Sequence, residues 1–144
     1  MKEIILYQDL IDAAEEWDWS LFRMLDLAGK MPFDLIGWSS AGRAVGVEVK
    51  MERRIGGLRI DAPMPASWFD GGRRHQLGFL RKLANDGGVA LIMVYRADRK
   101  GGGWTMLRLR SGLVGDLRMV PVSCFEVTEL GSGLEGWICS IITP

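Results

Sequence analysis

Two short strands joined by a tight turn are predicted over residues 32–50, PFDLIGWSSAGRAVGVEVK. Within this stretch FDLIGWS has the composition of a strand and SAGR that of a turn, while AVGVEVKM alternates apolar and polar residues as a half-buried strand does. Successive side chains of a strand point to opposite faces, so Glu48 and Lys50 share one face. The sequence therefore predicts a β-hairpin that carries Asp34 on one strand and Glu48 and Lys50 on the other.

Asp34, Glu48 and Lys50 together suit the hydrolysis of a phosphodiester bond. Carboxylates at neighbouring strand positions can hold a hard divalent cation through oxygen ligands, and Mg²⁺ is the usual one. Such a cation polarises a phosphate and lowers the pKa of a bound water, while a lysine on the same face stabilises developing negative charge. The pattern leaves one alternative open, an exposed strand whose polar face reads Glu-x-Lys without a catalytic role.

Amphipathic helices are predicted on both sides of the hairpin. Residues 3–16 have an apolar face at helical spacing, made of Ile4, Ile5, Leu10, Ile11 and Ala14. Residues 73–85, which precede an Asp-Gly-Gly helix stop, have a second apolar face, made of Leu77, Leu80 and Leu83.

Further strands are predicted at VALIMVYR (89–96) and WTMLRLR (104–110), while WDWSLFRML (17–25) is either a strand or a continuation of the first helix. VALIMVYR is a continuous apolar run, which is typical of a strand buried on both faces. The order α-β-β-β-α-β predicts a single α/β domain over residues 1–144, with its core at about 3–110. The C-terminal extension, 111–144, has candidate short strands at RMVPV and WICSIIT.

Composition indicates a cytoplasmic protein that can bind nucleic acid. No apolar run approaches the roughly 20 residues that cross a bilayer, and we expect neither a signal peptide nor a membrane. Cys124 and Cys139 lack the spacing of zinc ligands, so buried thiols are expected. The formal net charge is zero, yet residues 37–110 hold fourteen basic and six acidic side chains. Phosphate binding depends on local potential, so a DNA partner stays open.

The stretch PFDLIGWSSAGRAVGVEVK resembles the active-site hairpin of PD-(D/E)xK nucleases, with Asp34, Glu48 and Lys50 at the motif positions. Within that superfamily the chain is similar to Holliday junction resolvases of the archaeal Hjc and bacterial RecU types. The segment HQLGFLRKLANDGGVALIMV carries the RecU-like part, and the opening helix, GVEVK and WTMLRL carry the Hjc-like part. The resemblance covers about residues 3–110 and implies a restriction-endonuclease-like fold, in which helices flank a central mixed β-sheet.

The resemblance also implies roles for individual residues. Asp34, Glu48 and the Val49 carbonyl would bind Mg²⁺, for which Mn²⁺ would substitute, and Lys50 would be the catalytic cation. Gln76 would lie close to the metal-bound water; the alternative is a solvent-facing residue in the first turn of a helix. Hjc-type enzymes add a glutamate from the first helix, but Tyr7 stands at the matched position here. Glu3 or Asp9 would substitute after a shift of register, unless both belong to an acidic solvated helix face.

Basic residues around the hairpin are candidates for contacts with DNA phosphates, which position a duplex without reading its sequence. They are Arg23, Lys30, Arg53, Arg54, Arg59, Arg73, Arg74, Arg81 and Lys82. Individually, such residues are also common as solubilising side chains on a protein surface.

The sequence thus predicts a Mg²⁺-dependent endodeoxyribonuclease of DNA recombination and repair, which resolves four-way junctions by paired cuts in the cytoplasm of a cell or of a phage-infected host. Paired cuts predict a homodimer, with the apolar tail WICSIITP as a candidate for its interface. Two alternatives remain: another PD-(D/E)xK nuclease acting on flaps or branches, and a non-catalytic DNA-binding module of the same fold.

Overall fold

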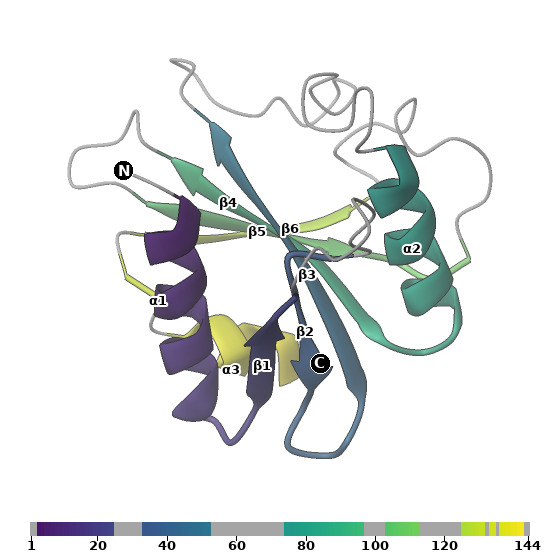
Figure 1. Ribbon diagram of the computed structural model, residues 1–144, viewed down its shortest axis with the longest axis horizontal. Helices are drawn as coiled ribbons and strands as arrows, with labels where there is room; N and C mark the ends of the chain where they lie inside the picture. The colour runs from purple at the N-terminus through teal and green to yellow at the C-terminus, as the bar shows by residue number, and fades with distance from the viewer. Residues whose placement is uncertain are drawn as a thin grey trace.

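Six β-strands form one sheet, and three helices accompany it, in the part of the chain that the structure describes (Figure 1). The computed structural model describes residues 3–24, 33–52, 74–96, 103–112, 125–131, 133–134 and 136–142. In chain order the elements are α1 (Glu3–Glu15), β1 (Ser20–Arg23), β2 (Leu35–Trp38), β3 (Ala44–Glu52), α2 (Arg74–Asn85), β4 (Val89–Arg96), β5 (Trp104–Leu109), β6 (Phe125–Gly131) and α3 (Trp137–Ile142). None of these described helices is long and apolar enough to cross a bilayer.

The strands lie in the sheet in the order in which they occur along the chain. β3 and β4 are parallel, and the other neighbouring pairs are antiparallel. Parallel neighbours need a crossover connection, and α2 lies in the one that joins β3 to β4. The predicted α/β architecture, a mixed sheet flanked by helices in the order α-β-β-β-α-β, is therefore confirmed.

One face of the sheet packs against α1 and α3. Val45, Val47 and Val49 of β3 point to this face and are at most 3% exposed. The helices contribute the buried residues Leu6, Tyr7, Leu10 and Ala14 from α1, and Trp137, Ile138 and Ile141 from α3. This layer is apolar, and its burial supplies a large part of the drive to fold.

The other face of the sheet packs against α2, which Figure 1 shows on the opposite side from α1. Its apolar cluster joins α2 to β4, β5 and β6 and consists of Leu77, Leu80, Ala84, Ala90, Ile92, Val94, Leu107, Leu109 and Phe125. On β3 the residues that alternate with the valines are Gly46, Glu48 and Lys50, all buried. The predicted half-buried strand is therefore wrong in one respect: β3 is covered on both faces, because layers of helices lie on both sides of the sheet.

The buried face of α1 differs from the predicted one. Leu10 and Ala14 are fully buried as expected, whereas Ile5 is 52% exposed, and Leu6 and Tyr7 take the buried positions. Residues 6, 7, 10 and 14 follow the spacing of a single helix face, and Ile5 lies off that face. The Ile4 side chain lies outside the described residues.

The C-terminal extension belongs to the sheet and its core. β6 pairs with β5 along its length, although no strand was predicted at 125–131. The strand predicted at WICSIIT is wrong, since this segment forms α3, and RMVPV lies outside the described residues. Periodicity cannot distinguish a short apolar run in a strand from one in a helix. Here the helix places Trp137, Ile138 and Ile141 on one face, against the sheet.

Two smaller expectations for this region change as well. The apolar side chains of the tail WICSIITP that were expected at a dimer interface are buried inside the chain's own core at Trp137, Ile138 and Ile141. Cys139, expected to be buried, is exposed on the outer side of α3. Cys124 lies outside the described residues.

Gly46 leaves little room for a side chain, because Leu83 of α2 and Phe33, which precedes β2, pack over it. A Cβ at this position would lie 2.8 Å from Leu83 Cδ2 and 2.9 Å from Phe33 Cδ1, closer than side-chain atoms pack. We therefore expect Gly46→Ala to lower the free energy of unfolding by about 1–3 kcal/mol, because overpacking forces neighbours apart. Urea denaturation followed by circular dichroism measures the change. The matched control is Gly78→Ala in α2, where an added Cβ meets nothing within 4 Å; it should stabilise by about 0.5–1 kcal/mol. Equal effects of both variants would contradict this packing argument.

Candidate active site

Asp34 is held beside the middle of β3 by two hydrogen bonds. Its backbone N–H donates to the Val47 carbonyl over 3.1 Å, and its Oδ2 accepts the Val49 N–H over 2.8 Å. These two partners stand on either side of Glu48 in the chain. β2 begins at the next residue, Leu35, which pairs with Val47. The hairpin thus brings the Asp34 carboxylate next to Glu48, and the side chain of Asp34 is 8% exposed.

Glu48 is the most enclosed of the predicted site residues. It is fully buried, in the layer between the sheet and α2, and its partner on β4 is Ile92. Neither of its carboxylate oxygens has a hydrogen-bond partner among the described residues. Lys50 Nζ lies 3.8 Å from Oε2, which is longer than a hydrogen bond. Burying a carboxyl group without hydrogen-bond partners lowers the stability of the fold, so its presence here calls for a functional reason.

Lys50 of β3 and Gln76 of the first turn of α2 lie at the same site as the two carboxylates. Lys50 Nζ donates to Gln76 Oε1 over 3.3 Å, and both side chains are buried. The solvent-facing alternative for Gln76 is therefore wrong. Glu48 is enclosed, whereas Asp34, Lys50 and Gln76 each keep 7–8% of their surface exposed.

Electrostatics at the site favour the protonated form of Glu48 in the absence of a cation. Burial in the apolar layer, followed by the negative charge of Asp34, raises the pKa of Glu48 from its ordinary value of 4.5 to about 9. The positive charge of Lys50 acts in the opposite direction but does not outweigh burial. In the absence of a cation, Glu48 therefore retains its proton at neutral pH.

The donor set fits a hard divalent cation. Glu48 offers two oxygens without partners, and the carboxylate of Asp34 has lone pairs beyond the one used by the Val49 N–H. Oxygen ligands of this kind suit Mg²⁺. The side chain of Val49 packs on the α1 side of the sheet. The predicted third ligand is therefore the main-chain carbonyl of Val49.

The structure does not bring a first-helix acid to this site. Asp9 is exposed and lines a groove with Asp12 and Glu16 on the outer side of α1. Tyr7, at the position matched to the resolvase glutamate, is buried in the α1 core layer. Glu3 begins α1, and its side chain lies outside the described residues. Within the described ranges no group of three or more acidic, histidine or cysteine side chains is placed to hold a metal.

The predicted DNA-binding residues divide into three groups. Arg23 is exposed, with its guanidinium 5.3 Å from the centre of the Tyr7 ring, which is a cation–π contact. On α2, Lys82 is exposed and Arg81 half-buried. Outside the described residues lie Lys30, Arg53, Arg54, Arg59, Arg73 and the side chain of Arg74.

The sequence reasoning missed three arginines that the fold gathers elsewhere. Arg43, Arg108 and Arg110 line one hollow at the end of α2 that is distant from Lys50. Only Arg43 carried a signal, a cationic residue in the predicted hairpin turn. The other two lie at the end of β5, and their proximity to Arg43 depends on the order of strands in the sheet.

Stability should depend on pH through Glu48. Between pH 4.5 and 9 the folded protein retains a proton on Glu48 that the unfolded chain has lost, so the free energy of unfolding falls as pH rises through this window. We expect Glu48→Gln, studied without metal, to remove this part of the pH dependence. At pH 8.5 it should exceed the wild type in stability by about 1–3 kcal/mol, because an uncharged amide replaces the buried carboxyl group of Glu48.

Urea denaturation in EDTA at pH 5, 7 and 8.5 measures both effects. Glu126→Gln is the matched control, since Glu126 is 56% exposed and its replacement should leave the pH dependence unchanged. Parallel pH profiles for wild type and Glu48→Gln would rule out a raised pKa at this residue.

No protein-family model, no curated protein and no solved structure matches this chain. The chemistry of the site is therefore inferred from its own side chains. They are two neighbouring buried carboxylates, a lysine on the same strand face, and a glutamine from α2 that accepts a hydrogen bond from that lysine.

Proposed function

We propose that this chain is a metal-dependent DNA endonuclease of the PD-(D/E)xK type, with a restriction-endonuclease-like fold. The observation that carries the proposal is the pair Asp34 and Glu48, brought together by the β2–β3 hairpin in a buried layer that also contains Lys50. A structural role alone does not require two adjacent buried carboxyl groups, and ionising both of them is unfavourable. A bound cation would offset that cost.

Mg²⁺ held by Asp34, Glu48 and the Val49 carbonyl would polarise a phosphodiester and lower the pKa of a coordinated water. The protein's own groups divide the remaining work. Lys50 supplies a positive charge on the same strand face as Glu48, where it stabilises negative charge that develops on a phosphate oxygen. Gln76 accepts a hydrogen bond from Lys50 and so orients the lysine toward the site.

The substrate we propose is branched DNA, in particular a four-way junction, cut in both strands by a homodimer. Support comes from the PD-(D/E)xK resemblance of residues 32–50 and the RecU-like segment that begins at His75 and Gln76. The position of Gln76 beside Lys50 adds to it. Flaps and simpler branches are the substrates to compare, because the carboxylate pair is suited to any phosphodiester.

Cleavage should require Mg²⁺ or Mn²⁺ and the carboxylate pair. We expect Asp34→Asn and Glu48→Gln to lower the rate of junction cleavage by roughly 10²-fold or more, since each removes a charged ligand of the cation. Lys50→Met should lower it by roughly 10²–10³-fold, a typical effect for a group that stabilises transition-state charge. Gln76→Ala should have a smaller effect, roughly tenfold, because Gln76 acts through Lys50.

The assay uses a synthetic four-way junction beside flap, Y-shaped and linear duplex DNA, with product ends mapped on sequencing gels. Asp12→Asn is the control, since this carboxylate is exposed and bonded to Gln8 on the outer side of α1. Wild-type rates for Asp34→Asn would refute the nuclease proposal. Equal rates on junction and linear duplex would refute the junction preference alone.

A further inference from the structure

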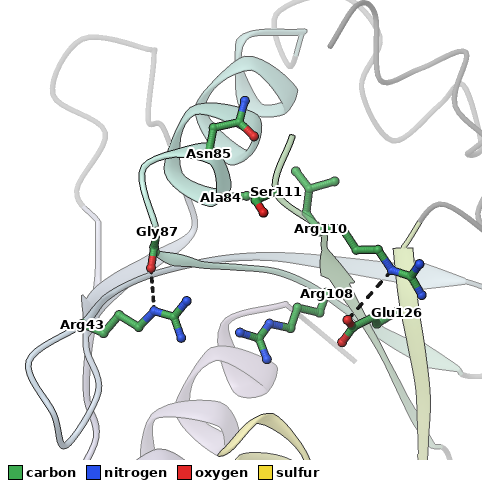
Figure 2. Close-up of a pocket in the computed structure, with 10 residues that line it drawn as sticks. Arg43, Ala84, Asn85, Gly87, Arg108, Arg110, Ser111 and Glu126 are labelled. Atoms are coloured by element: carbon green, nitrogen blue, oxygen red, sulfur yellow. Dashed lines mark hydrogen bonds and ion pairs between the residues drawn. The ribbon is translucent and has the colours of Figure 1, made fainter. Parts of the chain in front are cut away.

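A polar hollow of about 380 Å³ lies at the end of α2 opposite to Lys50 and Gln76. It forms where the β2–β3 turn, the α2–β4 turn and the ends of β5 and β6 meet (Figure 2). The polar side chains that line it are Arg43, Asn85, Arg108, Arg110, Ser111 and Glu126. These residues come from four separate segments, so the hollow exists only in the folded chain.

The charge of the hollow is positive. Three arginines line it against the single carboxylate of Glu126, which is 3.9 Å from Arg110 Nε in an exposed ion pair. An exposed pair of this kind is weak, so Arg110 can exchange it for another anion. The neutral lining groups Asn85 and Ser111 add an amide and a hydroxyl, which can donate hydrogen bonds.

Arg43 and Arg108 are positioned for a shared ligand. Figure 2 shows the two guanidinium groups extending toward one another from opposite sides of the hollow. Each is anchored through one nitrogen: Arg43 Nε donates to the Gly87 carbonyl over 2.5 Å, and Arg108 Nη1 donates to the Ile141 carbonyl over 3.2 Å. A guanidinium has five N–H groups in a rigid fork, so both retain donors for a phosphate. The backbone bonds hold the side chains in place before a ligand arrives.

The end of α2 does not cancel this attraction. A helix C-terminus carries a partial negative charge on its last carbonyl groups. Here those carbonyls are bonded: Lys82, Ala84 and Leu83 accept the N–H groups of Asp86, Gly87 and Gly88, in that order. The three positive charges of the arginines therefore dominate the potential of the hollow.

The distance from the carboxylate pair suits a second contact on one nucleic acid molecule. Arg43 precedes Glu48 by five residues, or roughly 17 Å of extended strand at about 3.3 Å per residue. Asn85 follows Gln76 by nine residues of α2, or about 14 Å of helix at 1.5 Å per residue. Two backbone phosphates a few nucleotides apart on one strand are separated by a distance of this order, because the axial rise of about 3.4 Å per step adds to their displacement around the helix.

We propose that the hollow bounded by Arg43, Arg108 and Arg110 binds a backbone phosphate of nucleic acid, a few nucleotides from the phosphate at Asp34 and Glu48. The identification of that nucleic acid as DNA rests on the proposed nuclease function. The anion site itself rests on the arginines, and it can be tested without cleavage.

The test is DNA binding by the full chain in EDTA, where no cleavage occurs. Fluorescence anisotropy with a labelled duplex and a labelled four-way junction, between 50 and 300 mM NaCl, gives the affinity and its salt dependence. Arg43→Gln and Arg108→Gln should each weaken binding roughly three- to tenfold and reduce the slope of log K against log salt by about 0.9, the value for one phosphate contact.

Two carboxylate variants distinguish the effect of a charge in the hollow from the effect of the net charge of the protein. Glu126→Gln should strengthen binding, because it removes the only negative side chain among the described residues that line the hollow. Glu16→Gln makes the same change at an exposed residue just after α1, in a groove that shares no lining residue with the hollow, and should leave binding unchanged. Both replaced side chains are exposed, so these variants fold even where loss of an anchored arginine does not.

A direct probe is inorganic phosphate, followed by the Nε–Hε signals of Arg43 and Arg108 in NMR spectra. Saturable shifts that are lost in Arg108→Gln support the site. Unchanged salt slopes in both arginine variants, or equal gains from Glu16→Gln and Glu126→Gln, overturn it.

The two proposals fail separately. If the chain cleaves DNA with Mg²⁺ but the arginine variants bind DNA as the wild type does, the phosphate-site proposal fails and the nuclease proposal stands. Absence of cleavage on every substrate together with the expected binding changes removes the nuclease and leaves a phosphate-binding surface.

Discussion

The carboxyl group of Glu48 is buried between β3 and α2, and most of the functional architecture follows from that placement. Burial disfavours its charged form, and the neighbouring Asp34 adds to the effect, so the pKa of Glu48 rises to about 9. A protein that retains such a group must satisfy it with a proton or with a cation. The hydrogen bonds that hold Asp34 beside it, and the one that joins Lys50 to Gln76, make the second solution available.

The two faces of the sheet differ in polarity. The face toward α1 and α3 is a continuous apolar layer, with valines of β3 packed against helical residues. The face toward α2 is apolar at Ala90, Ile92 and Val94 of β4 and at Leu107 and Leu109 of β5, but it is polar along β3, where Glu48 and Lys50 replace hydrophobic side chains. The first layer supplies hydrophobic stabilisation, which lets the second tolerate an unfavourable buried charge. Such a local conflict with stability is what is expected at a functional site.

α2 extends between two polar regions, one of which favours a cation and the other an anion. At its first turn Gln76 contacts Lys50 beside the carboxylate pair, which attracts a cation. At its last turn Asn85 lies with Arg43 and Arg108 around a hollow that attracts an anion. Because the helix is a rigid rod, the separation of the two regions is set by its length. Under the two proposals, a phosphodiester chain and its cation would contact both ends of α2.

Local pattern was enough to predict the hairpin at 32–50, both major helices and the apolar strand at 89–96, because alternation and helical spacing depend on residues close in sequence. The same pattern placed Asp34, Glu48 and Lys50 together before any fold was known. Tertiary structure alone decided the full burial of Glu48 and Lys50, since alternation cannot reveal that helices cover both faces. It also decided that WICSIIT is a helix with Trp137 in the core, and that Asp9 faces away from the site. The meeting of Arg43 with Arg108 depended on the order of strands in the sheet, which no local pattern contains.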